Sequence, residues 1–285
     1  MDEISRDLSD SALVASIEAN LFGFFPFFGN LPTVETHIGS DWSWAITDFQ
    51  YPLFNSILRA RLDPEKVDGY IEAAKSRASS RGVPLLWWIG PATRPADLGG
   101  RLAAHGFLHE GHAPGMAVRL CELSGNVPVP SDLTIVEVQD ATTIETWCHT
   151  AATGFEMSEA VETGWRAWFL NIGLNPKLRH FLVLWKERPV ATASLFLDSG
   201  VAGIYNVATV HDARRLGIGA IITLRCLQEA RAMGYRMAIL HSSPMGVGLY
   251  RRLGFREYCK IDHYLFSPLP GEIVSQDPSN KQNGL

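Results

Sequence analysis

The sequence predicts an α/β (α+β) fold of two similar domains in tandem, each a mixed β-sheet flanked by helices. Strand-like and helix-like patterns alternate through the second half of the chain. A stretch rich in Pro and Gly lies near the middle, and the two halves end with a similar order of elements. The chain has 285 residues, of which 46% are hydrophobic, so each half has enough apolar residues for a core of its own.

The second half contains the clearer elements, because its apolar residues recur with the periods of strands and helices. The predicted strands cover residues 133–138, 181–185, 190–197, 201–210, 237–241 and 255–266, with a hairpin turn at 186–189. The predicted helices cover residues 142–150, 158–170, 217–234 and 245–253.

Pro and Gly cluster at residues 124–131, which we interpret as a linker. This linker divides the chain into one domain of residues 1–123 and another of residues 132–267. The remaining residues, 268–285, are rich in Pro, Ser, Gln and Asn, and we expect them to form a disordered tail.

The two halves share a faint internal repeat. In the first half an apolar strand at 85–91 precedes a helix at 96–105 and then Gly106-Phe107. In the second half a strand at 238–240 precedes a helix and then Gly254-Phe255. We interpret this order as a diverged tandem duplication, and chance recurrence is the alternative.

Composition narrows the classes of partner. The net charge of −5 disfavours a nucleic acid as the main partner. The four cysteines are far apart in the sequence and do not have the spacings of metal ligands. The N-terminus lacks the basic region of a signal peptide, and the apolar run at 21–28 is shorter than the roughly 20 residues of a membrane span. We expect that run to pack against the first half's core; a lid or a dimer contact is the alternative. These features predict a cytoplasmic monomer or homodimer with no metal, nucleic-acid or membrane partner.

The segment at 205–220, YNVATVHDARRLGIGA, carries the clearest functional signal. An apolar strand leads into a short loop with two arginines and two glycines, and the loop opens directly into a helix. Glycine lets the backbone approach an anion closely, and the first turn of a helix presents unpaired N–H groups with a partial positive charge. This combination predicts a cradle for a pyrophosphate, to which Arg214 and Arg215 would add cationic donors.

The loop resembles the acyl-CoA-binding signature of the GNAT superfamily, the acetyl-CoA-dependent N-acetyltransferases. Arg214, Gly217 and Gly219 match the Gln/Arg-x-x-Gly-x-Gly/Ala pattern. Residues 243–255 resemble a second family segment, Asn-x-x-Ala-x-x-Leu-Tyr-x-x-x-Gly-Phe. There Leu249, Tyr250, Gly254 and Phe255 match, whereas Ser243 and Gly246 replace the usual Asn and Ala. The resemblance extends over residues 133–266.

The resemblance implies a sheet that is splayed at its centre, between the strands at 201–210 and 237–241, with acetyl-CoA or another acyl-CoA in the gap. Main-chain groups of one strand would pair with pantetheine, and backbone N–H groups of the loop would hold the pyrophosphate. Ser243 would stand where the usual Asn makes a polar contact. The implied cofactor-binding residues are Val207, Ala208, Thr209, Arg214, Arg215, Leu216, Gly217, Ile218, Gly219, Ala220 and Ser243.

Tyr250 matches the family position of a general acid. Attack on a thioester expels a thiolate whose conjugate thiol has a pKa of about 8.5, and a phenol with a pKa of about 10 can protonate it at little cost. Packing in the core is the alternative role for this side chain. The general base is left open among Asn206, His211, His241 and Glu156, which lie near the motif strands, and a relay through water.

The first half lacks these parts. Leu102 stands where the tyrosine would be, and no Arg-x-x-Gly-x-Gly precedes it, so this half resembles a degenerate GNAT domain. Trp42, Trp44 and Ile46 alternate along one strand face; core packing or an aromatic wall of the acceptor pocket would explain them. In the second half the pocket is expected at 151–174, where an apolar wall would comprise Trp165, Trp168 and Phe169.

The sequence therefore predicts an acyltransferase that moves an acetyl group, or another short acyl group, from acyl-CoA to the amine of a small molecule by direct attack. A binding module that senses acyl-CoA without turnover is the alternative from another class. Transfer to an oxygen or to a protein acceptor is a further possibility. The tyrosine favours an enzyme, since a sensor needs a cradle but no acid.

Overall fold

The computed structural model describes residues 4–24, 27, 29, 33–123 and 129–268. The chain divides into two compact units. Unit 1 comprises Met1–Phe24 and Gly115–Tyr258, and unit 2 comprises Phe25–Pro114 and Cys259–Leu285. The first residues of the chain thus belong with the second half, and the last strand continues into unit 2. Most of the predicted linker and tail lies outside the described residues.

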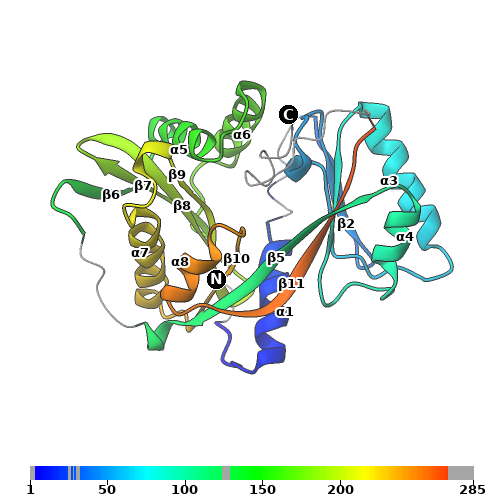
Figure 1. Cartoon of the computed structure of the whole chain (residues 1–285), viewed down its shortest axis with the longest axis horizontal. Helices are drawn as coiled ribbons and strands as arrows, with labels where there is room; N and C mark the ends of the chain where they lie inside the picture. The colour runs from blue at the N-terminus through cyan, green and yellow to red at the C-terminus, as the bar shows by residue number, and fades with distance from the viewer. Residues whose placement is uncertain (1–3, 25–26, 28, 30–32, 124–128, 269–285) are drawn as a thin grey trace. The chain divides into compact units, whose positions relative to one another are not determined.

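The sheet of unit 1 is mixed: among the strands described for this unit, one neighbouring pair is parallel. The strand order is β5-β10-β9-β8-β7-β6 (Figure 1). β9 and β10 run parallel, and every other neighbouring pair is antiparallel. The strands are β5 (Leu108–Arg119, residues 115–119 in this unit), β6 (Leu133–Glu137), β7 (Leu178–Trp185), β8 (Arg188–Asp198), β9 (Val201–Thr209) and β10 (Met237–His241).

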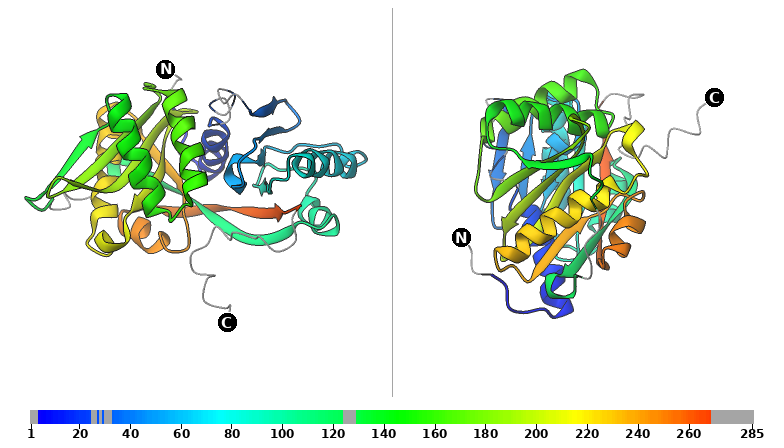
Figure 2. Two further views of the ribbon diagram at one scale, coloured as in Figure 1. Left: turned by 90° about the horizontal axis from the view of Figure 1, so that it is seen from above. Right: turned by 90° about the vertical axis from the view of Figure 1, so that its left-hand side faces the viewer.

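Helices cover both faces of this sheet (Figures 1 and 2). α5 (Ala141–Gly154) and α6 (Glu159–Ile172) pack on one face, and α7 (Ile218–Ala232) packs on the other. η3 (His211–Ala213) follows β9, α8 (Val247–Arg252) follows β10, and η2 (Leu120–Glu122) follows β5. α1 (Asp10–Phe22) packs beside β8, β9 and β10. The predicted helices of the second half are all present, with ends shifted by a few residues.

The helices of unit 1 differ in how their first turns are capped. Asp140 Oδ1 accepts the N–H of Thr143 at 2.8 Å at the start of α5, and Ser158 Oγ accepts the N–H of Val161 at 3.4 Å at the start of α6. α7 begins after Gly217 and has no side-chain cap. Since the first N–H groups of a helix have no intrahelical acceptor, α7 starts with donors that are open to a ligand.

Residues 21–24, the first part of the apolar run at 21–28, belong to unit 1. The ring of Phe24 lies 4.3 Å from that of Phe196 and 4.6 Å from that of Tyr205. The expectation that this run packs against the core of the first half is therefore wrong for Phe24, because α1 places it against the second half. Residues 25, 26 and 28 lie outside the described part. No helix in the described ranges is long and apolar enough to cross a membrane.

Unit 2 repeats the order of elements that unit 1 shows from β9 to α8. Its strand order is β1-β2-β3-β4-β11, and β3 and β4 form a parallel pair. α3 connects the parallel strands, and α4 follows β4. The elements are β1 (Glu35–Ile38), β2 (Ser43–Ile46), η1 (Pro52–Phe54), β3 (Ser56–Leu58), α3 (Val67–Arg81), β4 (Leu85–Ile89), α4 (Leu98–Ala104) and β11 (Arg256–Phe266, paired with β4 through residues 262–266).

The core of unit 2 takes up the tryptophans of its first strands. Trp42 and Trp44 are each 8% exposed, and both pack with Ile46 and the fully buried Trp87. The rings of Trp42 and Trp87 lie 6.2 Å apart. Of the two explanations offered by the alternating pattern, the structure supports core packing.

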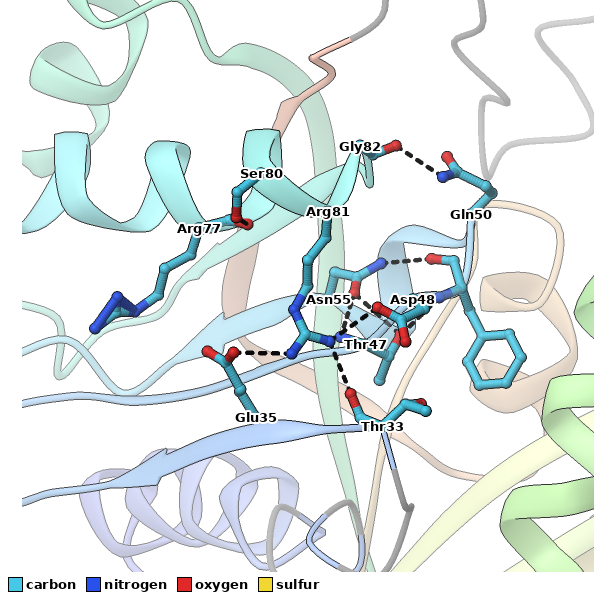
Figure 3. Close-up of polar contacts among 11 residues, drawn as sticks. Thr33, Glu35, Thr47, Asp48, Gln50, Asn55, Arg77, Ser80, Arg81 and Gly82 are labelled. Atoms are coloured by element: carbon cyan, nitrogen blue, oxygen red, sulfur yellow. Dashed lines mark hydrogen bonds and ion pairs between the residues drawn. The ribbon is translucent and has the colours of Figure 1, made fainter.

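Asn55 fastens a turn of unit 2 through its fully buried amide (Figure 3). Its Oδ1 accepts from the N–H of Thr47 at 2.7 Å, and its Nδ2 donates to the carbonyls of Phe49 at 2.8 Å and Tyr51 at 3.1 Å. A buried amide is costly unless its polar atoms are bonded, so these bonds fix one conformation of the turn.

Candidate active site

β9 and β10 separate within unit 1. Their register contains only the pairs Ala202↔Ala238 and Gly203↔Ile239. β9 continues to Thr209 along β8, and β10 continues to His241 along β5, so beyond Gly203 the two strands diverge. In an antiparallel pair, alternate residues turn their main-chain groups away from the partner strand. Some groups of β9 beyond Gly203 therefore face the gap, where an extended ligand could pair with them.

A bulge interrupts β9 at the start of the gap. The β8–β9 register shifts between Thr192 and Ser194, and Asn206 adopts a left-handed φ of 52°. Thr192 Oγ1 donates to the carbonyl of Asn206 at 2.9 Å, and the Nδ2 of Asn206 donates to Ser194 Oγ at 3.0 Å. These bonds hold the bulge just ahead of Val207, the first residue predicted to pair with pantetheine.

The loop after β9 leaves a row of backbone donors open. Arg215 and Gly217 both have positive φ, at 64° and 79°. A Cβ atom added at Gly217 would meet nothing within 4 Å. Among the residues the structure describes, no acceptor is found for the N–H groups of Arg215, Leu216, Gly217, Ile218 or Gly219. Consecutive N–H groups at a helix start favour an anion.

Ala220 differs from the rest of the predicted cradle. Its N–H donates to the carbonyl of Gly217 at 3.0 Å, so it is occupied within the first turn of α7. The row of open donors therefore ends at Gly219.

Arg214 does not supply the free cation that the sequence suggested. Its Nε donates to the carbonyl of Thr209 at 3.1 Å, and its Nη2 donates to the carbonyl of Gly154 at 2.8 Å. Its Nη1 lies 3.1 Å from Glu156 Oε1. The guanidinium thus fastens the loop to the end of β9 and to the C-terminal turn of α5, where a cation is favourable. Arg215 is exposed, and its side chain makes no hydrogen bond or ion pair with any described residue.

The two motif segments meet in space. A Cβ atom added at Gly219 would lie 3.2 Å from Leu249 Cδ1 and 3.8 Å from Thr209 Oγ1. Gly219 therefore brings the start of α7 against α8 and the end of β9. Ser243 accepts the N–H of Gly246 through its Oγ at 3.3 Å and so forms the turn that begins α8.

Tyr250 lies on α8 with its ring against the core of unit 1. The ring is half-buried and lies 5.8 Å from that of Phe255. The hydroxyl has no hydrogen-bond partner among the described residues. Burial raises the pKa of Tyr250 above its ordinary value, so the hydroxyl keeps its proton. Both predicted roles, general acid and packing residue, are compatible with this placement.

The structure weighs against two of the candidate bases. Glu156 is held by Arg214 at the end of β9 that leads into the cradle, away from the bulge. His211 is exposed at the start of η3, beyond the end of β9. Neither side chain lies at the start of the gap.

Asn206 and His241 lie where the strands diverge. Asn206 forms the bulge, and its side-chain Nδ2 already donates a hydrogen bond to Ser194 Oγ. His241 ends β10, with its ring 6.2 Å from that of Tyr205. Of the four candidates, His241 is thus the titratable group nearest the fork.

Sequence reasoning missed His180, which is buried behind the bulge. Its Nδ1 lies 2.8 Å from Ser194 Oγ, the same hydroxyl that accepts from Asn206. The rings of Trp147 and Phe169 lie 4.4 Å and 5.1 Å away. Burial lowers the pKa of His180 to about 3, so the ring is neutral. A histidine inside the apolar run of β7 was the available signal.

The lowered pKa of His180 leads us to expect that unit 1 loses stability in acid. Its pKa falls from 6.5 to about 3 on folding, so below pH 6.5 the unfolded chain binds a proton that the folded chain does not. The free energy of unfolding should therefore fall with pH below 6.5, by up to about 1.4 kcal/mol per unit from this group. His180→Asn, which keeps an acceptor for Ser194, should show a shallower fall in urea unfolding between pH 7 and 4.5. Equal slopes for the variant and the wild type would contradict this.

The expected apolar wall of an acceptor pocket is part of the core. Trp165 and Trp168 are each 4% exposed and Phe169 is 1% exposed. Their rings pack on one another and on Trp147, with Trp165 and Phe169 4.8 Å apart. α5 and α6 are amphipathic, and these aromatic residues are on their inner faces. The wall interpretation is therefore wrong for these side chains.

The corresponding loop of unit 2, between β3 and α3, has no comparable row of open donors. Its N–H groups at Arg61 and Leu62 donate to the carbonyls of Asp41 and Arg94, and those at Glu65 and Lys66 donate to Oδ1 and the carbonyl of Asp63, each at 3.0 Å. The carboxylate of Asp63 lies in the turn before α3, where it would repel a phosphate. Leu102, on α4, is fully buried.

The comparisons with known proteins concern the same part of the chain. Residues 139–255 match the model of the acetyltransferase (GNAT) family, a segment that contains the splayed strands, the open cradle and Tyr250. Residues 139–255 are therefore a GNAT-family domain. The resemblance to the GNAT superfamily and the predicted fold class, a centrally splayed sheet flanked by helices, are thereby confirmed. No curated protein matches the sequence.

Solved structures share the GNAT fold over nearly the whole chain. A GCN5-related N-acetyltransferase from Kribbella flavida is 22% identical, with a TM-score of 0.67 over 90% of this chain and 97% of that one. One from Sphaerobacter thermophilus is 15% identical, with a TM-score of 0.61 over 93% and 94%. A tandem GNAT protein from the clavulanic acid biosynthesis pathway is 12% identical, with a TM-score of 0.57 over 95% and 98%. At these identities the likeness shows the fold alone.

Proposed function

We propose that unit 1 transfers an acetyl or other short acyl group from acyl-CoA to the amine of a small molecule. The observation that carries this proposal is the row of open N–H groups from Arg215 to Gly219 beside the gap between β9 and β10. A pyrophosphate offers the acceptors that such a row needs, and pantetheine offers amides that can pair with an exposed strand edge.

The proposed reaction is a direct attack. The nitrogen of the acceptor amine forms a bond to the thioester carbonyl carbon, the carbon–sulfur bond breaks, and the electron pair leaves on sulfur. Tyr250 gives its proton to that thiolate, and the amine loses one proton to a base or to water. His241 is the titratable side chain best placed near the fork to receive it. In this scheme Val207, Ala208 and Thr209 hold pantetheine, while Ser243 shapes the turn before Tyr250.

Two features favour an enzyme over a sensor of acyl-CoA. The hydroxyl of Tyr250 makes no bond to a described residue, whereas a purely structural tyrosine that is partly buried usually bonds its hydroxyl to the protein. The ring is nonetheless supported by Phe255, so the hydroxyl is held in a defined place. Transfer to an oxygen or to a protein acceptor would use the same residues, and thiol release measured with amines, alcohols and peptides separates these cases.

Acetyl-CoA should bind once per chain. The cradle of unit 1 has five consecutive open donors, whereas most N–H groups in the matching loop of unit 2 already donate to backbone carbonyls or to Asp63. Isothermal titration of the full chain with acetyl-CoA should therefore give a stoichiometry of one. Two equivalent sites would overturn the proposal that the first half is a degenerate domain.

The acceptor can be sought by thiol release. The full chain is incubated with acetyl-CoA and a library of amines, alcohols and peptides, and free CoA thiol is followed. Release with small amines supports the proposed acceptor class. Binding of acetyl-CoA without release by any acceptor would favour the sensor.

A further inference from the structure

Helix α1 is joined to β9 by a buried amide near its C-terminal end. Asn20 is 0% exposed. Its Nδ2 donates to the carbonyl of Asp198 at 2.9 Å, and its Oδ1 accepts from the hydroxyl of Tyr205 at 2.9 Å. Both functional atoms of the amide are thus bonded to residues of the acyltransferase sheet. Since an unbonded buried amide is costly, the two bonds specify how α1 sits on that sheet.

Glycines on both sides make this contact close. A Cβ atom added at Gly203 of β9 would collide with the side chains of Asn20 and Tyr205. One added at Gly23, after α1, would collide with the carboxylate of Asp198 and lie 3.2 Å from Phe196 Cε1. The helix is therefore seated where only glycine leaves room, and it has little freedom to shift.

Tyr205 stands at the fork where β9 and β10 part. The last paired residue of β9 is Gly203, and the Tyr205 ring lies 6.2 Å from the ring of His241 on β10. The ring of Phe24 lies 4.6 Å away on the other side. Burial raises the pKa of Tyr205, so its hydroxyl stays protonated and can donate the hydrogen bond to Asn20 Oδ1. Asn20 thus fixes an aromatic side chain that stands between the diverging strands.

The next residue along the chain is Asn206, whose left-handed φ forms the bulge. β8 holds Asn206 through Thr192 and Ser194, and α1 holds Tyr205 through Asn20. The main chain that leads into Val207 is therefore anchored from two separate elements. A shift of the reacting groups by about 1 Å can cost a hundredfold in rate, so such anchors bear directly on acyl transfer.

We propose that Asn20 is a positioning residue of the acyltransferase: α1 keeps Tyr205 at the fork and thereby sets the strand edge that receives the pantetheine arm. This inference rests on the proposed function. It gives the N-terminal helix a role in acyl-CoA binding, because α1 contacts β9, the strand expected to pair with pantetheine, and, within the described residues, does not contact the pyrophosphate cradle.

The experiment compares two ligands that share the pyrophosphate. Acetyl-CoA contacts both the cradle and the strand edge, whereas 3′-phospho-ADP has the pyrophosphate and no pantetheine. Titration of full-length Asn20→Leu should show acetyl-CoA binding weakened about tenfold, with 3′-phospho-ADP bound as by the wild type. Tyr205→Phe should show the same pattern. The double variant should lose little more than either single one, because both remove the same bond.

Asn55→Leu is the matched control. It also removes a fully buried amide with several bonds, but in unit 2, so it should lower the melting temperature and leave both affinities unchanged. The inference is overturned if folded Asn20→Leu binds acetyl-CoA within twofold of the wild type, or if it loses both ligands equally. Failure of the wild type to bind either ligand would overturn the proposed function itself, and this inference with it.

Discussion

Tyr250→Phe is expected to lower kcat by about 10²–10⁴-fold and to leave acetyl-CoA affinity nearly unchanged. The hydroxyl would act on the departing thiolate, which exists only as the transition state is passed. Its loss should therefore affect turnover rather than ground-state binding. The aromatic ring, which packs against Phe255 and the core of unit 1, is retained in the variant.

The packing role of Tyr250 makes the opposite prediction. A residue that only packs would show near-normal turnover and a nearly unchanged melting temperature, because phenylalanine keeps the packed ring. The hydroxyl has no partner among the described residues, so its removal should change stability by less than the roughly 1 kcal/mol of a typical hydrogen bond. Steady-state kinetics separate the two roles, and a melting curve on the same preparation checks that the variant is folded. A kcat within about threefold of wild type would remove Tyr250 from the mechanism.

The pH dependence of turnover gives a second check on Tyr250. Because burial raises its pKa above the ordinary value, the hydroxyl stays protonated throughout the neutral and mildly alkaline range. Any gain in rate between pH 6 and 9 would then report the deprotonation of the base or of the acceptor amine. Tyr250→Phe should keep the shape of that profile at a lower rate.

Gly217→Glu is expected to abolish acetyl-CoA binding, a loss of more than about a hundredfold. Gly217 lies in the middle of the open N–H row, with φ at 79° and free space where a side chain would begin. A glutamate there would place its own carboxylate beside donors that otherwise face a pyrophosphate, and it would repel the ligand. Titration calorimetry with acetyl-CoA measures the effect.

Gly82→Glu is the matched control for that variant. Gly82 ends α3 in unit 2 with φ at 66°, and an added Cβ atom would likewise meet nothing within 4 Å. Both substitutions carry the same charge and a similar backbone strain of about 1–2 kcal/mol. Gly82→Glu should therefore lose comparable stability and bind acetyl-CoA normally. Equal loss of binding in the two variants would show that strain, and not the cradle, accounts for the effect.

The sequence by itself determined the fold class and the backbone of the loop from Arg214 to Gly219. Helix and strand periods are local, and so is the conformation of a loop whose glycine can take a positive φ. The open N–H groups follow from local structure as well, since a helix that begins after Gly217 has no side chain to cap it. The internal repeat could likewise be predicted from the sequence, because it depends only on the order of strands and helices along the chain.

Only the tertiary structure decided what the side chains around that loop do. Arg214 matches the motif, yet its guanidinium bonds to Gly154, 60 residues away in the chain. Tyr205 lies in a strand predicted from periodicity, yet its hydroxyl bonds to Asn20, 185 residues away. β7 begins at Leu178, ahead of the predicted residue 181, because distant groups neutralise its polar start: Glu137 and Glu229 bind Arg179, and Ser194 bonds to His180.

The physical reason is that a side chain's partner depends on which elements pack together, and local sequence does not encode that packing. A cation in a glycine-rich loop can face a ligand or a carbonyl. A tryptophan on an amphipathic helix can line a pocket or fill a core. The pattern is the same in both cases, and the free energy of burial against distant elements selects between them. The motif therefore located the site, while the fold determined which of its residues remain open to a ligand.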